Sequence, residues 1–112
     1  MKRKKTNPEL KELIDSFSHT KEKFYRIISK YLSRPRRKMT PVNLAKINNC
    51  AVENDIIVIP SKVLAQGELN KKVKIYAFSY SKKCEEKIKS SGSEIHKIRE
   101  VLDKNLKGKI II

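Results

Sequence analysis

The chain has 112 residues, of which 38% are hydrophobic and 35% are charged, enough for one small domain with a modest core and too apolar for wholesale disorder. Its formal net charge of +15 is self-repelling, which predicts an anionic polymer as partner. The longest apolar run, Ile56 to Ile59, is far too short to cross a bilayer, so we expect no membrane partner.

A short cationic tail opens the chain and consists of Lys2, Arg3, Lys4 and Lys5. A helix is predicted to follow it, because Asn7 can cap a helix and Pro8 suits the first helical position. One apolar stripe at helical spacing runs along this segment: Leu10, Leu13, Ile14 and Phe17.

A second helix is predicted after the short link at residues 18–20, with Thr20 as its cap. Its wider apolar stripe consists of Phe24, Ile27, Ile28, Tyr31 and Leu32. Tyr25, Arg26 and Lys30 are expected to face away from that stripe. Because the link is short, the two helices should pack as antiparallel neighbours.

A basic arm follows, with four cations: Arg34, Arg36, Arg37 and Lys38. Pro35 and Pro41 push the residues before them out of the α region, so we expect the arm to be extended. Beyond it, residues 42–47 fit either a short extended piece or the lead into a turn of helix around 47–52, and the pattern does not separate the two.

Strands alternate with helices over residues 55–112, which predicts an α/β body. Strands are expected at 55–60, ended by Pro60, at 73–77 with Lys74 and Tyr76 on a wet face, at 94–96, and at 109–112 after Gly108. Residues 61–72 are expected to form a loop around Gly67. Helices are expected at 82–90, capped by Ser81 and ended by Gly92, and from 98 to about 105.

The positive charge is concentrated in the first part of the chain. Residues 1–46 hold 14 lysines and arginines against 4 acidic residues, whereas residues 47–112 hold 13 against 8. We therefore expect a basic N-terminal helical region with its arm at 1–46 and a compact α/β body at 47–112, together one structural unit. The asymmetry favours a nucleic-acid partner.

Candidates for catalysis are few. His19 falls in the expected inter-helix turn and His96 at an element boundary, so we interpret both as structural. Cys84 lies on the inner face of a predicted helix and is distant from Cys50, which favours reduced thiols in a cytoplasmic protein. The basic N-terminus lacks the apolar segment of a secretory signal. Without zinc-ligand spacing, a P-loop or a dinucleotide fingerprint, we expect no enzyme, metal, cofactor or small-molecule substrate.

The basic segments favour a different chemistry. Lysine and arginine neutralise phosphates, and arginine can also bridge two phosphate oxygens or stack on a base, which makes the arm the strongest candidate contact. Asn43 suits a base edge or a ribose hydroxyl, although a turn role fits it equally well. Lys62, Lys71 and Lys72 bracket a loop and suit a second contact patch. No DNA-binding motif or aromatic stacking strand occurs, which favours folded RNA over duplex DNA.

Ordered motifs span nearly the whole chain: Thr6-Asn7-Pro8, Pro35-Arg36-Arg37, Val42-Asn43-Leu44 with Lys46-Ile47, Val58 to Leu64 with Gly67, and the Lys-Gly-Lys of residues 107–109. In these motifs the sequence resembles the L18e family of archaeal and eukaryotic large-subunit ribosomal proteins, and in length it is similar to the archaeal members. The resemblance implies a structural constituent of the large subunit that binds and stabilises its folded rRNA beside neighbouring ribosomal proteins. It also implies the fold of the bacterial L15 proteins, an irregular β-β-α body behind a basic N-terminal helical extension.

The resemblance assigns rRNA contacts to Arg36, Arg37, Asn43, Lys46 and Lys62. With the charge argument, the expected rRNA-binding set is Lys2, Arg3, Lys4, Lys5, Arg34, Arg36, Arg37, Lys38, Asn43, Lys46, Lys62, Lys71 and Lys72. Met39-Thr40 stands where the family more usually has a basic residue or histidine and then a small residue. Ser61 and Ala65 stand where glycines are common, which argues against a very close approach of that loop to a phosphate.

Two other functions fit parts of this pattern. An architectural or regulatory DNA-binding protein would share the charge but should prefer duplex DNA. A small RNA-modifying enzyme would need a nucleophile or a metal site, which the residues above do not supply. We expect the protein not to form a homo-oligomer.

Overall fold

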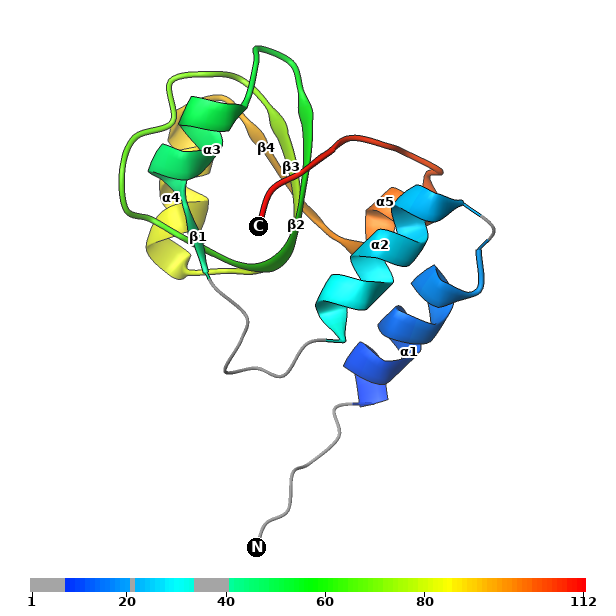
Figure 1. Ribbon diagram of the computed structural model, residues 1–112. Coiled ribbons are helices and arrows are strands. Elements are labelled where there is room, and N and C mark those ends of the chain that lie inside the picture. The colour runs from blue at the N-terminus through cyan, green and yellow to red at the C-terminus, as the bar shows by residue number, and fades with distance from the viewer. Residues whose placement is uncertain (1–7, 21, 34–40) are drawn as a thin grey trace, which may run out of the picture.

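The computed structural model describes residues 8–20, 22–33 and 41–112, and in these ranges helices cover both faces of a five-stranded sheet (Figure 1). The strands are β1 (Val42–Asn43), β2 (Ile56–Leu64), β3 (Lys74–Tyr80), β4 (Glu94–Lys97) and β5 (Lys109–Ile110). One face carries α3 (Leu44–Cys50) and α4 (Lys82–Ser90). The other face carries α1 (Pro8–Ser18), α2 (Lys23–Leu32) and α5 (Arg99–Asp103). The predicted α/β class, with helices preceding the sheet, is confirmed.

β2 is the central strand, and every strand pair in the described residues is parallel. Along one of its edges runs β3, from the pair Ile56–Lys74 to the pair Val63–Tyr80. Its other edge is shared, because β5 pairs near the amino end of β2 and β1 pairs near the carboxyl end, where Val42 lies opposite Val63. β4 completes the order β1-β2-β3-β4 by pairing with β3.

The prediction that Pro60 ends its strand is wrong, because β2 continues through this residue to Leu64. Proline has no amide hydrogen to donate to a neighbouring strand. The pairing of β2 with β3 shifts register between Ile59 and Lys62, so the irregularity falls where the donor is missing. The loop predicted at 61–72 is correspondingly shorter.

The two N-terminal helices form as predicted and run antiparallel (Figure 1). Asn7, the expected cap of α1, lies outside the described residues. Thr20 does not cap α2: the N-cap position is Glu22, and the Thr20 hydroxyl donates to the Phe17 carbonyl at 3.2 Å. Tyr25 was expected to face outward but is only 1% exposed, and its hydroxyl donates to the Leu106 carbonyl at 2.6 Å.

Both alternatives for residues 42–52 are realised in part. The extended piece is β1, which is two residues long, and α3 begins immediately after it. Asn43 is the N-cap of α3, since its side-chain oxygen accepts the Lys46 backbone N–H at 2.9 Å. The loop after β2 packs closely against this helix at Gly67, which has a φ of 95°. A Cβ at this position would lie 2.7 Å from the Ala45 backbone nitrogen, so a larger residue would not fit.

The C-terminal predictions are largely confirmed. α4 has the predicted bounds, and the Ser81 hydroxyl accepts the Cys84 backbone N–H at 3.2 Å. Gly92 ends it with a φ of 85°, while the Ser93 N–H donates to the Ile88 carbonyl at 3.2 Å, as in a Schellman motif. β4 and α5 form where expected, whereas β5 pairs only over two residues.

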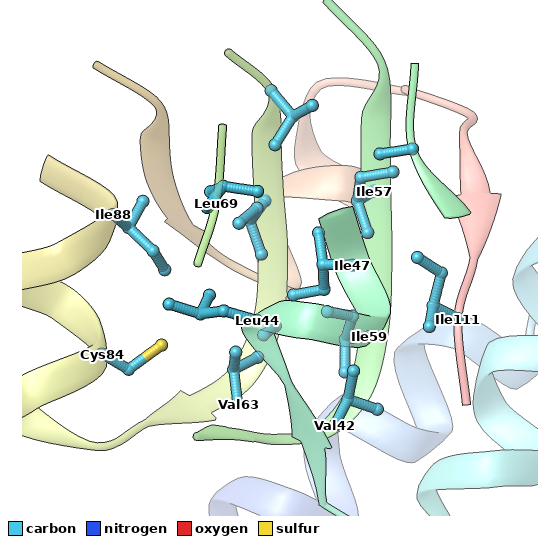
Figure 2. Packing of buried hydrophobic residues seen from close by; sticks show 14 residues of the cluster. Val42, Leu44, Ile47, Ile57, Ile59, Val63, Leu69, Cys84, Ile88 and Ile111 are labelled. Carbon is cyan, nitrogen blue, oxygen red and sulfur yellow. The ribbon is translucent and has the colours of Figure 1, made fainter. Parts of the chain in front are cut away.

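Each face of the sheet has its own cluster of buried residues. The cluster under α3 and α4 includes Leu44, Ile47, Ile57, Ile59 and Ile88 (Figure 2). Because helices cover both faces, β2 buries consecutive residues instead of alternating buried with exposed ones.

The cluster on the opposite face joins the N-terminal helices to the sheet. Phe17 and Ile28 pack there with Val58 and Tyr76. Tyr76 was expected on a wet face and is instead 2% exposed, because α1, α2 and α5 cover this side. The division expected between residues 46 and 47 falls within α3, and the helices of the first part share a core with strands of the second.

Two further findings concern the cysteines and the lengths of the helices. Cys50 is exposed, Cys84 is buried, and both thiols are free. Among the helices of the described ranges, none combines the length and the apolar character that a bilayer crossing requires.

Candidate nucleic-acid interface

The arm and the cationic tail, which carry most of the expected contacts, lie outside the described residues. These positions are Lys2, Arg3, Lys4, Lys5, Arg34, Arg36, Arg37 and Lys38, together with Met39 and Thr40. The described residues at either end of the arm are Ser33, which caps the C-terminus of α2, and Pro41, which precedes β1. α2 ends and β1 begins on the same side of the molecule, the lower side in Figure 1.

Lys62 lies beside the point where the arm joins the sheet. Val42 of β1 is level with Val63 of β2, so Pro41 is level with Lys62 in this parallel pair. On its other side Lys62 pairs with Ser79 of β3. The Lys62 side chain is exposed and has no ion pair with a described residue. Its ammonium group is therefore available to a phosphate next to the arm.

Asn43 and Lys46 have structural contacts of their own. The Asn43 side-chain oxygen caps α3, which is the turn role that the sequence left open. The Lys46 ammonium is at the surface and donates a hydrogen bond to the carbonyl of Ile112, tying α3 to the C-terminal residue. The Asn43 amide N–H groups and the remaining Lys46 donors have no hydrogen bond to the described part of the chain and suit a ligand.

The predicted second patch is not brought together, because Lys71 and Lys72 lie at the opposite end of the sheet from Lys62. Ile56 is level with Lys74, and Lys62 is six residues further along β2, roughly 20 Å away at ~3.3 Å per residue. The Lys71 ammonium donates at 2.7 Å to the carbonyls of both Asn48 and Ala51. Lys71 thereby ties down the end of α3, whereas the side chain of Lys72 is exposed.

A basic surface that the sequence-based set left out lies on α2. Lys23, Arg26 and Lys30 are all exposed, and none has an ion pair with a described residue. At ~100° per residue these positions fall within about 60° of arc, so the three form one stripe, the α2 basic face. The spacing i, i+3, i+7, without an acidic residue from Lys23 to Ser33, is the signal that would have identified it.

The α2 basic face stands on a firmly packed helix. Its buried residues are Tyr25, Ile28, Ser29 and Leu32, on the side turned toward the sheet. The chain passes from its C-terminal end, through Ser33, into the arm. The α2 basic face and the arm are therefore consecutive parts of one strongly cationic segment.

Several other cations are neutralised by carboxylates. Arg99 pairs with Glu12 at 3.3 Å, Lys104 with Glu100 at 3.3 Å, and Lys109 with Asp55 at 3.3 Å, while Lys107 pairs with Glu22. Surface pairs of this kind add little stability, but they reduce the local positive field. The unneutralised charge is thus distributed unevenly over the described surface.

Both histidines contact neighbouring residues of the fold. His19 Nδ1 lies 2.6 Å from the Asp15 carbonyl at the end of α1. The His96 ring stacks on Tyr76, with centroids 4.5 Å apart, and contacts Glu94 at 2.9 Å and Glu100 at 3.2 Å.

Among the described residues, His96 belongs to no metal-binding group and Cys84 is not a reactive thiol. The hydrogen bond with His96 lowers the pKa of Glu94. The two glutamates contact different ring nitrogens of His96, and the described residues contain no group of three His, Cys, Asp or Glu that could hold a metal. Burial raises the pKa of the Cys84 thiol to about 11, so that it is protonated at neutral pH.

The chain is similar to known proteins over most of its length. The family model described as ribosomal proteins 50S-L15, 50S-L18e and 60S-L27a matches residues 9–96. The chain is 38% identical over 109 residues to the large ribosomal subunit protein eL18 of Archaeoglobus fulgidus, covering 94% of this chain and 93% of that protein. It is 36% identical over 113 residues to eL18 of Sulfolobus acidocaldarius, covering 99% and 96%. For eL18 of Methanococcus maripaludis the identity is 36% over 107 residues, covering 92% and 89%.

Proposed function

Because this chain belongs to the family of ribosomal proteins L15, L18e and L27a, we propose that it is a structural constituent of the large ribosomal subunit of an archaeon, where it binds and stabilises folded large-subunit rRNA. The observation that carries the proposal is similarity over nearly the full length to archaeal proteins named as large ribosomal subunit proteins. The net charge of +15 supports it, because a polyanion would offset the self-repulsion of the chain.

The proposed rRNA surface has two parts, and the first is the N-terminal segment. It comprises the tail of Lys2, Arg3, Lys4 and Lys5, the α2 basic face, and the arm with Arg34, Arg36, Arg37 and Lys38. In this segment Arg36 and Arg37 are the principal contacts, since a guanidinium group can hold two phosphate oxygens at once. The packed helix α2 would present its cations in a fixed arrangement next to the arm.

The second part consists of polar and basic residues of the sheet and its flanking helix. Lys62 is its central member, because it is exposed beside the end of the arm. Asn43, Lys46 and Lys72 are secondary contacts. Lys71 is assigned to the fold, because its ammonium already donates to two backbone carbonyls.

In this proposal the protein acts by binding alone and catalyses no reaction. Each lysine or arginine that neutralises a phosphate releases condensed counterions, which gives affinity with a strong dependence on salt. Its partners are large-subunit rRNA and the ribosomal proteins beside it, and its location is the ribosome in the cytoplasm. No cofactor, metal ion or small-molecule substrate is part of the proposed function.

Co-sedimentation with large subunits tests the proposal directly. The full chain should sediment with purified archaeal large subunits in low salt and dissociate in high salt. A chain that remains in the supernatant at every salt concentration would contradict the proposal.

The arm is tested by replacing Arg36 and Arg37 with alanine. The double variant should bind an rRNA fragment more weakly and lose about 0.7 to 0.9 units of log–log salt slope for each phosphate contact removed. Unchanged affinity and slope would show that the arm does not contact phosphates. Competition between rRNA fragments and duplex DNA separates the ribosomal function from the DNA-binding alternative. The alternative requires that duplex DNA displace the rRNA fragment from the protein.

A further inference from the structure

A cavity opens between α1 and the carboxyl ends of β3 and β4, and none of the residues assigned to rRNA above lines it. Its volume is about 490 Å3, within the range of ~300–1,000 Å3 that is usual for small-ligand pockets. Its lining includes Leu10 of α1, Phe78 and Ser79 at the end of β3, Lys97 at the end of β4, and the side chains of Glu12 and Arg99. The lining thus combines apolar side chains, one of them aromatic, with polar groups of both signs.

The strand register connects this cavity to the arm. The Ile98 N–H donates to the Ala77 carbonyl at 3.0 Å, which carries the β3–β4 pairing one residue beyond Lys97 and sets Ile98 level with Phe78. Ser79, the next lining residue, is the β3 partner of Lys62. Pro41, Lys62 and Ser79 therefore lie side by side across β1, β2 and β3.

Lys62 and the cavity are also on the same face of the sheet. Val63 belongs to the buried cluster under α3 and α4, so Lys62, one residue earlier, points to the opposite face. Phe78 packs against the cluster on that opposite face, with α1 and α5. A bound polymer that contacts the arm and then Lys62 would consequently reach the cavity without crossing the sheet.

Unneutralised positive charge lies on both sides of the cavity. Lys62 and Lys97 are exposed and have no ion pair with a described residue. The negative charge of Glu12 is offset by Arg99, whose guanidinium nitrogen lies 3.3 Å from the Glu12 carboxylate. The formal charges of these four side chains therefore sum to +2, although the cavity itself is mainly apolar.

We propose that this cavity receives one unpaired base of the bound RNA, which packs against Phe78 while Lys62 and Lys97 contact phosphates on either side of it. This proposal rests on the proposed function, since it names which part of the RNA the carboxyl end of the sheet binds. A nucleotide supplies both features that the site demands, an apolar face for Phe78 and negative charge for the two lysines. The Ser79 hydroxyl can donate to or accept from an edge of the base.

A side chain of a neighbouring protein would fill the apolar part of the cavity but would leave the two lysines without phosphates. The position of the cavity also agrees with the general preference of parallel sheets to bind ligands outside the carboxyl ends of their strands. The charge and the location together favour the RNA base.

The test uses overlapping transcripts that tile archaeal large-subunit rRNA, carrying 4-thiouridine, and the full-length protein. After irradiation, the transcript that binds should crosslink to the peptide that contains Phe78. This experiment uses the unsubstituted protein. In parallel, Leu10→Trp should fill the cavity from α1 and weaken binding of that transcript about 5- to 150-fold, the range expected from one base stacked on an aromatic ring. Because phosphate contacts remain, the salt slope of Leu10→Trp should equal that of the unsubstituted protein.

Val52→Trp is the matched control, since Val52 is 63% exposed and lies before the amino end of β2. It should bind the transcript like the unsubstituted protein, and circular dichroism should show native helix content in both variants. Normal affinity of Leu10→Trp, with crosslinks only outside the Phe78 peptide, would overturn the base site and leave the proposed function intact. Normal RNA affinity of Leu10→Trp with failure to join large subunits would overturn it in favour of a protein partner. If no transcript binds the protein in a salt-dependent way, the proposed function is overturned as well.

Discussion

Neutralising the α2 basic face is expected to weaken rRNA binding chiefly through its salt dependence. The triple variant Lys23→Gln, Arg26→Gln, Lys30→Gln removes three exposed cations from the side of α2 opposite its buried residues, and none of them has an ion pair with a described residue. If each contacts one phosphate, the log–log salt slope should fall by about 2 to 3 units, at ~0.7 to 0.9 per contact. The ratio of affinities at ~50 mM and ~200 mM salt should then shrink about 20- to 40-fold.

A second triple variant provides the control for charge alone. Lys82→Gln, Lys83→Gln, Lys89→Gln removes the same three charges from exposed positions of α4, which lies across the sheet from α2 (Figure 1). Fluorescence anisotropy with a labelled rRNA fragment, measured from low to high potassium chloride, gives the slope for each protein. The α4 variant should retain a slope close to that of the unsubstituted chain, because its charges act only through the long-range field.

Equal slopes for the two triple variants would refute this reasoning. That result would mean that the RNA responds to net charge and that α2 makes no fixed contacts with it. A loss of affinity with an unchanged slope would point to damage to the fold, which urea unfolding of the free protein would detect.

Three further predictions concern the fold. Tyr25→Phe should lower the free energy of unfolding by ~0.5–1.5 kcal/mol in urea titrations, because the Leu106 carbonyl loses a part-buried hydrogen bond of 2.6 Å; an unchanged midpoint would contradict this. Cys50 should react rapidly with a disulfide reagent, whereas Cys84, whose pKa burial raises to about 11, should react only in denaturant, and two fast thiols would contradict this. The Lys97 backbone N–H lowers the pKa of Glu100, so stability from this carboxylate is present above its unfolded pKa and lost as the pH falls through the folded pKa. Glu100→Gln should therefore flatten the stability profile between about pH 5 and pH 3, as measured by urea unfolding, and a profile parallel to the unsubstituted one would contradict this.

Local signals in the sequence predicted most of the helices and strands. The Ser81 cap and the Gly92 stop bound α4 correctly, because both act within one turn of the helix that they delimit. The same holds for the apolar stripe of α1. The membership in the L18e family was likewise predicted from ordered motifs, and the comparisons confirm it.

The errors arose where long-range contacts decide the local outcome. Tyr25 looked like an outward residue of α2, yet the chain returns about 80 residues later and gives its hydroxyl an acceptor. Pro60 looked like a strand end, yet the register shift against β3 absorbs the missing donor. Tyr76 looked solvent-exposed until α5 and the N-terminal helices were placed over it.

For the candidate interface, residue type was predictable and arrangement was not. The arm was identified from its arginines and prolines, and its own contacts remain a prediction because it lies outside the described residues. The grouping of Lys62 with Lys71 and Lys72 failed, because β2 carries Lys62 along the sheet to the other end. The α2 basic face was overlooked although its spacing is visible in the sequence.

The sequence by itself predicted a polyanionic partner, bounded α4 correctly and identified the family, because charge, capping residues and ordered motifs can be read along the chain. Only the tertiary structure decided which cations are neutralised and which remain available. It also set Lys62 between the end of the arm and the cavity beside Phe78. These relations depend on the register of parallel strands that are distant in sequence, and such register is fixed by the packing of two cores.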